Sequence, residues 1–264
     1  MFKKIAKEKT RKLLSLVSIA TATLILPNTA TATIVEFYTS QGNFQVNLFD
    51  QTTPKTVDNF LTYVESEHYS DSVIHRVATD FVVQGGGYTF EGVWPLTPLE
   101  ANESVVNEPI YSNVLGTIAM AKIGSDMNSA TNQWFFNLAD NSENLDQQNG
   151  GFTVFGQVIG DGMTVVNKIA GLDLCTYDSL TGIPMVMGSE QICSDMLAPG
   201  VENFVVIEQV VIVDSSAVTD SDLSPQLSIY PDSDTDTDDS GGSTTWLTLV
   251  MLSLFAVKKR LKLY

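Results

Sequence analysis

Positive charge is scarce in this sequence once its two ends are set aside. Of the 14 lysines and arginines, six lie before residue 13 and four lie after residue 257. Between them only Lys55, Arg76, Lys122 and Lys168 remain. This central part keeps about 30 acidic residues against those four bases, so its net charge is near −26. So strong a negative charge argues against nucleic acids and anionic membranes as its partners.

Cysteine and histidine are equally scarce. The sequence has two cysteines, Cys175 and Cys193, without C-x-x-C spacing, and two histidines, His68 and His75. This inventory argues against zinc and dithiol redox chemistry, so we expect neither a metal nor a cofactor. In an oxidising compartment the two cysteines are expected to form a disulfide, which would stabilise the fold by roughly 3 kcal/mol.

The first 32 residues have the pattern of a secretory signal peptide. Six cationic residues precede an apolar stretch over residues 13–26, and Ala30 and Ala32 form an Ala-x-Ala site before Thr33. The apolar stretch is short for a membrane span, which disfavours the alternative of an uncleaved anchor. We therefore predict export, with the folded domain beginning at residue 33.

The end of the chain is also patterned. Residues 215–240 are rich in Ser, Thr and Asp, a composition that predicts a solvated spacer. Residues 241–264 then place two glycines before a short apolar run and a basic end. This order resembles the GlyGly-type C-terminal sorting signal of Gram-negative bacteria, which an intramembrane protease trims during export. The alternative is a plain C-terminal membrane anchor, although the apolar run is short for one.

Residues 33–214 have the length of one domain and the pattern of a mainly β protein. Residues 34–38 and 44–48 predict a hairpin. Other β-type runs lie at 73–77, 81–84, 117–121, 133–138, 153–158 and 204–213. Many short strands with few helices favour a closed antiparallel barrel capped by two helices.

Two helices are predicted in this domain. The first opens with Thr53 as N-cap and Pro54 in the first turn, and it carries an apolar stripe. That stripe consists of Val57, Phe60, Leu61 and Val64. The second helix follows Gly160 and buries Met163, Val166 and Ile169.

The stretch 73–87 carries the clearest chemical signal. Arg76 lies five residues before Phe81 and eight before Gln84, and three glycines close the run. A guanidinium beside apolar and amide groups suits holding a neutral, carbonyl-rich ligand. A phosphate loop is disfavoured, because neither a helix start nor a P-loop lysine follows the glycines. His75 is expected to face the interior, opposite to Arg76.

Several segments occur in the order and spacing of a known family. They are Ile74–Val77 with Phe81–Gly86, Gly116–Ala121, Asn132–Phe136, and Leu145–Asp146 followed by Val154–Gly156, together with the helix beginning Pro54–Phe60. The sequence thereby resembles the cyclophilin-type peptidyl-prolyl cis-trans isomerases, most closely their bacterial periplasmic branch. The resemblance covers about residues 34–169 and the last strand. It implies a closed eight-stranded antiparallel barrel with a helix at each end and an active groove on its outer face.

The resemblance also implies site residues. Arg76 matches the catalytic arginine, and Gln84 matches the amide that holds the substrate backbone. The proline pocket and the further groove positions match Phe81, Val82, Ala121, Gln133, Phe135, Leu145 and Phe152. Val82 takes the place of a methionine, and Phe152 falls near a usual histidine.

Several positions depart from the family pattern. Asn144 replaces a tryptophan linked to tight cyclosporin binding, so weak drug sensitivity is expected. Lys122 replaces an asparagine and Gly87 an aspartate. Residues 171–202, which carry both cysteines, have no counterpart among the matching motifs.

The implied reaction suits such a site. Rotation about an Xaa-Pro bond has a barrier of about 20 kcal/mol and takes roughly 10–100 s unassisted. A guanidinium that favours the twisted bond, beside an apolar pocket for the ring, would lower the barrier without a general base.

The expected substrates are proline-containing polypeptides that are unfolded or partly folded. We predict a monomer in the periplasm, on the outer surface or in the medium of a Gram-negative bacterium. One alternative is a non-catalytic module or chaperone that binds proline-containing segments at the cell envelope. Another is a structural or adhesive protein that the spacer projects from the surface.

Overall fold

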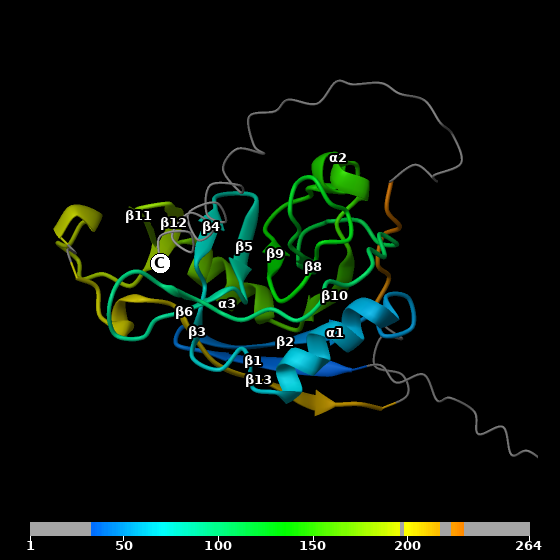
Figure 1. Cartoon of the computed structure of the whole chain (residues 1–264), viewed down its shortest axis with the longest axis horizontal. Helices are drawn as coiled ribbons and strands as arrows, with labels where there is room; N and C mark the ends of the chain where they lie inside the picture. Colours follow the sequence, from blue (N-terminus) through cyan, green and yellow to red (C-terminus); the bar gives the residue numbers. More distant parts are fainter. Residues whose placement is uncertain (1–32, 196–197, 217–222, 230–264) are drawn as a thin grey trace, which may run out of the picture.

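The computed structural model describes residues 33–195, 198–216 and 223–229. The predicted signal peptide and sorting segment lie outside these residues. The described part is mainly β and is built around one large curled sheet (Figure 1). In spatial order its strands are β4 (Arg76–Ala78), β5 (Val82–Gly85), β9 (Trp134–Asn137), β8 (Thr117–Met120), β10 (Val154–Ile159), β2 (Gly42–Leu48), β1 (Ile34–Thr39), β13 (Val206–Asp214), β3 (Ser72–Val73), β6 (Tyr88–Thr89) and β7 (Thr97–Pro98).

The helices are few, and the two long ones lie where the sequence predicted them. They are α1 (Pro54–Glu65) and α3 (Gly162–Ala170), with a four-residue α2 (Ser142–Leu145) between them. Three short 3-10 turns lie at Gln148–Gly150, Cys193–Asp195 and Val201–Asn203. Buried side chains of α1 and α3, among them Phe60, Val64, Val166 and Ile169, complete the main core against the sheet.

Thr53 is the N-cap residue of α1 and Pro54 lies in its first turn, as predicted, but the Thr53 side chain makes no capping hydrogen bond. The Thr53 hydroxyl donates back to the Phe49 carbonyl over 3.2 Å instead of accepting from the helix. Glu108 takes that place, because its carboxylate accepts from both the N–H and the hydroxyl of Thr56, at 2.9 and 2.8 Å. A carboxylate at a helix N-terminus also complements the helix dipole.

The predicted closed barrel of eight strands is wrong in both closure and count. The sheet is a curled half-barrel of eleven strands, with β4 and β7 at its ends. The ladder breaks at Ile74 and His75, so one chain segment supplies β3 to one part of the sheet and β4 to another. At the break the Ile74 N–H donates to the Val205 carbonyl and the His75 N–H to the Gln84 carbonyl.

The strands near β4 separate two apolar layers by simple alternation. On one face, Val77, Val83 and Phe136 belong to the main core. On the other face, Val82 and Phe135 belong to a second, smaller apolar cluster. Because successive strand residues point to opposite faces, the same strands build the interior and an outer surface. The candidate site lies on that outer surface.

The described part of the segment without a counterpart in the family motifs, residues 171–195, packs beside β4. Within it β11 (Asp173–Tyr177) and β12 (Leu180–Met185) pair as an antiparallel hairpin. Cys175 and Cys193 are joined in a disulfide, as the sequence predicted. Figure 1 shows the hairpin lying next to β4 at one side of the molecule.

Residues 223–229 return to the domain on its opposite side, beyond β10 (Figure 1). Leu227 forms an antiparallel bridge with Tyr111, the Ser112 N–H donates to the Gln226 carbonyl at 2.8 Å, and the Ser228 N–H donates to the Ile110 carbonyl at 2.9 Å. Within the predicted spacer, residues 223–229 are therefore held by backbone hydrogen bonds, although four of the seven are exposed. The segment is less polar than the rest of the predicted spacer, with Leu223, Leu227 and Ile229 among its seven residues, and Leu223 packs against the smaller apolar cluster.

We expect the substitution Ser228→Pro to lower the free energy of unfolding by about 1 kcal/mol, because it removes the N–H that donates to Ile110. Urea unfolding measures the change, and faster amide hydrogen exchange at Ser112 would show that the bridge has opened. Leu227→Ser is the matched control, because the Leu227 side chain is 67% exposed. Unchanged stability and unchanged exchange in Ser228→Pro would show that the segment is not held.

A second prediction concerns His75, which is 3% exposed. Burial, and then the nearby charge of Arg76, lower the pKa of His75 to about 3. Between that pKa and the unfolded value of 6.5, the unfolded chain binds a proton that the folded chain does not, so stability falls as the pH is lowered. From pH 7 to pH 4 this should cost roughly 3 kcal/mol.

The variant His75→Phe keeps an aromatic ring but cannot titrate, so its stability should fall less steeply with acid. Denaturant unfolding at a series of pH values compares the two slopes, and the common effect of carboxylate protonation cancels. His68→Phe is the comparison, because His68 is only partly buried. Parallel pH profiles for wild type and His75→Phe would contradict the prediction.

Candidate active site

On the outer face of the sheet, three of the predicted site residues lie in one row across β4, β5 and β9. Arg76 on β4 lies directly opposite Gln84 on β5, and Gln84 lies opposite Phe135 on β9. Directly opposed residues share a face, so the three side chains point the same way. The pairing of β4 with β5 thus explains why Arg76 and Gln84 lie eight residues apart in the sequence and yet share one face.

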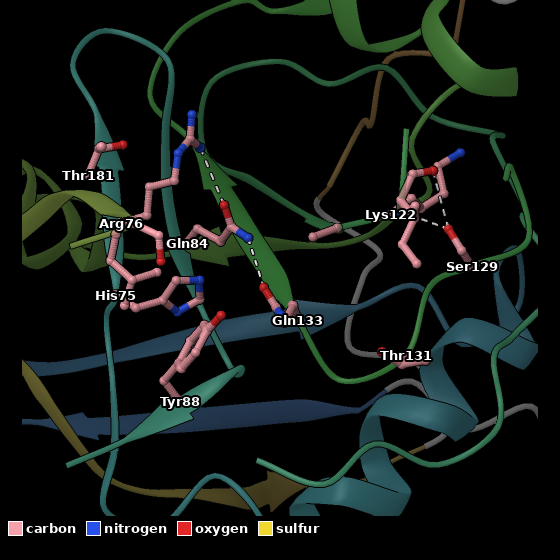
Figure 2. Close-up of a pocket in the computed structure, with 13 residues that line it drawn as sticks. His75, Arg76, Gln84, Tyr88, Lys122, Ser129, Thr131, Gln133 and Thr181 are labelled. Carbon is pink, nitrogen blue, oxygen red and sulfur yellow. Dashed lines mark hydrogen bonds between the residues drawn. The ribbon is translucent and has the colours of Figure 1, made fainter. Parts of the chain in front are cut away.

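A chain of hydrogen bonds runs from Arg76 through Gln84 to Gln133, the residue before β9. We call these three side chains the polar row. Arg76 Nη1 donates to Gln84 Oε1 at 3.3 Å, and Gln84 Nε2 donates to Gln133 Oε1 at 3.0 Å (Figure 2). A guanidinium has only donors, so Gln84 must turn its oxygen to Arg76 and its nitrogen to Gln133. Both amide oxygens are therefore used, and N–H groups remain for a ligand. The row presents donors to whatever binds on it.

The guanidinium keeps its positive charge in this setting. Arg76 is half-buried, and burial lowers the pKa of its side chain from a value far above neutrality. Its hydrogen-bond partner is a neutral amide, although acidic residues dominate the chain. Among the residues that the structure describes, no carboxylate forms an ion pair with Arg76, so its charge remains available to a neutral ligand.

The apolar candidates gather in the smaller cluster next to the row. Val82, Phe135 and Leu145 are buried members, and Phe81 and Phe152 pack against them partly exposed. The rings of Phe135 and Phe152 meet edge to face with centroids 5.9 Å apart. Exposed aromatic edges over a buried apolar floor suit a small ring such as that of proline.

The backbone around Phe81 is held from several sides. Phe81 follows Asp80 in a left-handed turn, and its N–H donates to the Ala78 carbonyl at 3.0 Å. Its carbonyl accepts from the Leu138 N–H and from the Asn141 side chain, each at 2.9 Å. These bonds place the ring over the cluster without help from a ligand.

A cavity of about 160 Å³ opens beside the polar row. Of the predicted site residues, Arg76, Gln84, Ala121 and Gln133 line it. The other five, Phe81, Val82, Phe135, Leu145 and Phe152, lie in the apolar cluster, where Ala121 also packs. The predicted residues thus form two groups, a row of donors that lines the cavity and an apolar surface. The two groups meet where Gln84 of β5 lies opposite Phe135 of β9.

Glycine makes room for this arrangement. A Cβ on Gly87 would lie 2.6 Å from the Gln133 side chain, closer than real contacts allow. The predicted role of the glycine run in backbone turning holds for Gly86, which has a φ of 82°.

Sequence reasoning noted Lys122 as a departure but gave it no role. Its side chain is buried, and its Nζ donates to the carbonyls of Asn149 and Gly151 while lying 4.8 Å from the centre of the Phe152 ring. Burial lowers the pKa of Lys122 to about 8, and the negative charge of Asp126 opposes that shift. Lys122 thereby holds the loop that carries Phe152.

His75 and Tyr88 also line the cavity and were not predicted to do so. Their rings meet edge to face at 4.8 Å, below Gln84 in Figure 2. His75 is interior, as expected, yet it reaches the same cavity as Arg76 because strand alternation stops at the break between β3 and β4. Residues 179–181 of the hairpin complete one side of the cavity. The hairpin packs beside β4 although about a hundred residues separate them in the sequence, so no local sequence signal predicted this contact.

Comparison with known proteins agrees with this geometry. The family model described as "Cyclophilin type peptidyl-prolyl cis-trans isomerase/CLD" matches residues 34–185. A peptidyl-prolyl cis-trans isomerase of Acinetobacter baylyi is 36% identical over 162 residues, covering 61% of this chain and 84% of that protein. Peptidyl-prolyl cis-trans isomerase A of Dickeya dadantii is 37% identical over 191 residues, covering 69% and 97%.

The solved structures agree on the fold. The crystal structure of a cyclophilin-type peptidyl-prolyl cis-trans isomerase of Cryptosporidium parvum matches with a TM-score of 0.50 at 21% identity. It covers 69% of this chain and 98% of that one. From the family match and the identity to its relatives, the chain belongs to the cyclophilin-type peptidyl-prolyl cis-trans isomerases, a family of enzymes.

Proposed function

We propose that this isomerase holds an Xaa-Pro segment with the prolyl ring on the apolar cluster and the preceding residue along the polar row. The observation that carries the proposal is the chain Arg76–Gln84–Gln133, which leaves donors facing outward next to Phe81 and Phe135. A peptide backbone supplies carbonyl acceptors and a proline supplies an apolar ring. The two halves of the site match the two halves of such a substrate.

Arg76 is the group that lowers the barrier in this proposal. When the Xaa-Pro bond twists, amide conjugation is lost and the prolyl nitrogen gains a lone pair that can accept a hydrogen bond. A guanidinium N–H directed at that nitrogen favours the twisted state over both planar states, which is the requirement for catalysis. Arg76 has further N–H groups beyond the one given to Gln84.

Gln84 acts in the same proposal as the anchor of the substrate backbone. Its Nε2 has a second N–H besides the one donated to Gln133, and that N–H is available for the carbonyl before the proline. One side of the bond is then held while the ring turns on the apolar cluster. No bond breaks, so the residues need only hold and donate.

Phe152 and Leu145 form the far rim of the apolar cluster in this proposal. Lys122 ties the loop at Gly151 to the sheet, so Phe152 keeps its contact with Phe135. Phe152 stands near the place of a groove histidine in the family pattern. We therefore propose a rim that is more apolar than usual.

The cellular setting is a further proposal. The basic and apolar start of the chain, the predicted disulfide between Cys175 and Cys193, and the GlyGly-type end together support export in a Gram-negative bacterium. There the enzyme would act on unfolded or partly folded exported polypeptides, as the periplasmic branch of the family does. It would act as a monomer, in the periplasm, on the outer surface or in the medium.

We expect Arg76→Ala to lower kcat/KM for an Xaa-Pro peptide by about 100-fold, because a donor to the twisted bond is worth that much. Arg76→Lys should fall in between, since it keeps the charge and loses the planar fork. NMR exchange between cis and trans peptide measures the rate. Lys168→Ala is the control, because Lys168 is an exposed cation on α3 that donates to Gln41.

Equal rates for wild type and Arg76→Ala would remove the arginine from the mechanism. A wild type that binds the peptide, with shifts at Phe81 and Phe135 but no faster exchange, would instead favour a non-catalytic binding module.

Intact-mass spectrometry of the native protein tests the export proposal. We expect a protein that starts at Thr33 and lacks the segment after Gly242. In the variant Ala32→Arg the Ala-x-Ala site is lost, so the leader should stay attached. A native protein that keeps both ends would contradict both processing steps.

A further inference from the structure

Asp146 is a buried carboxylate next to the apolar cluster, and the proposed reaction does not use it. The residue is 1% exposed and directly follows Leu145, a member of that cluster. Burying a carboxylate is costly to the fold unless hydrogen-bond donors surround it. What its two oxygens hold together therefore indicates why it is there.

Both oxygens of Asp146 are fully occupied by donors. Oδ1 accepts from the backbone N–H and from the side-chain amide of Asn113, each at 2.9 Å. Oδ2 accepts from the Ser112 hydroxyl at 2.6 Å and from the Ile229 N–H at 3.3 Å. Each carboxylate oxygen offers two lone pairs, so these four donors saturate the group.

Further hydrogen bonds run from Asp146 through three buried asparagines to the backbone of Phe81. Asn113 Oδ1 accepts from Asn137 Nδ2 at 3.3 Å. Asn137 Oδ1 accepts in turn from Asn141 Nδ2 at 2.7 Å. Asn141 Nδ2 also donates to the Phe81 carbonyl at 2.9 Å. We call the side chains of Asp146, Asn113, Asn137 and Asn141 the buried network.

The direction of each amide in the buried network follows from the carboxylate. Donors face both oxygens of Asp146, so this group only accepts. Asn113 must therefore turn its nitrogen to Asp146 and its oxygen to Asn137. Asn137 must then turn its oxygen to Asn141, which leaves Asn141 with an N–H for the Phe81 carbonyl.

The residues of the buried network hold the backbone of two more residues of the apolar cluster. The Asn141 carbonyl accepts from the Leu145 N–H at 2.7 Å. Asn113 Nδ2 donates to the Phe152 carbonyl at 3.0 Å, and the Phe152 N–H donates to the Leu145 carbonyl at 2.9 Å. The surface proposed for the prolyl ring thus rests on this network at Phe81, Leu145 and Phe152.

The chain itself completes the buried network from outside, through residues 223–229 (orange in Figure 1). We call these residues the tail segment. Its Ile229 supplies the fourth donor to Asp146. The Ser112 hydroxyl lies between the two parts, 2.6 Å from Asp146 Oδ2 and 2.9 Å from the Leu227 carbonyl. The tail segment and the proline surface are therefore joined at one carboxylate.

We infer that Asp146 is a positioning residue for the isomerase reaction and that the tail segment completes its setting, so that the grip on the prolyl ring depends on the tail segment. This inference rests on the proposed function, because the ring must lie on the apolar cluster. Loss of a donor to Asp146 loosens the backbone that carries Phe81, Leu145 and Phe152. A ring held less well in the planar and twisted states alike raises KM and leaves kcat unchanged.

The substitution Ile229→Pro tests this in the full-length protein, because it removes the N–H that donates to Asp146. We expect KM for an Ala-Pro peptide to rise about threefold, with kcat unchanged. Ile229→Ala is the matched control, because it shortens a side chain that is 47% exposed and keeps the N–H. NMR exchange at a series of peptide concentrations measures both constants.

The double variant Asp146→Asn with Ile229→Pro shows whether the tail segment acts through Asp146. Asp146→Asn places a donor where the network needs an acceptor, so it should raise KM by itself. Adding Ile229→Pro to it should then raise KM by much less than threefold, because the two changes share one interaction. Effects that multiply in full would overturn the route through Asp146.

Equal KM values for Ile229→Pro and Ile229→Ala would overturn the inference. So would a lower kcat at unchanged KM, since that result means only that less of the enzyme is folded. A wild type in which the bound peptide shifts neither Phe81 nor Phe135 would instead overturn the proposed function.

Discussion

The site depends on one constraint, which is that an arginine side chain can donate hydrogen bonds but cannot accept them. Arg76 therefore dictates which way Gln84 turns its amide, and Gln84 in turn dictates Gln133. A single residue thus orients two further side chains along the groove. The outcome is a surface of free N–H groups beside an apolar cluster, which is the complement of a peptide carbonyl beside a prolyl ring. An acceptor at position 76 would reverse the direction of both amides and turn their oxygens toward a ligand.

The sheet makes this surface possible while it also builds the core. Residues one apart on β5 and β9 belong to different apolar layers, since Val83 and Phe136 face inward while Val82 and Phe135 face the groove. The groove floor therefore lies on strands whose opposite face is packed in the core, and this packing restrains it. Catalysis of a bond rotation requires such restraint, because a floor that moved with the substrate would stabilise the planar and twisted states alike.

Local signals in the sequence were sufficient for much of this. The spacing of Arg76, Phe81 and Gln84 predicted a shared site, and the apolar stripe of α1 predicted its buried face. Contacts between distant segments were not predictable in the same way. The carboxylate of Glu108 caps α1 although it lies 52 residues from Thr56 in the sequence, and no residue near Thr53 predicts this contact. Likewise, the break between β3 and β4 arises because β3 pairs with β13 whereas β4 pairs with β5, two strands from different parts of the chain. Residues 223–229 pair through backbone N–H and carbonyl groups, which are present in every sequence and so give no signal.

A groove on the outside of a sheet has little depth of its own, so its walls must come from connecting segments. On one side the loop after α2 brings Phe152, tied to the sheet by Lys122. On the other side stands the β11–β12 hairpin, tied by Trp94 and by the disulfide. Neither tie involves the Arg76 row. Because the walls are anchored independently of the row, their residues can change what the groove selects while the chemistry of bond rotation stays the same. The most variable parts of such an enzyme should therefore be the parts that choose its substrates.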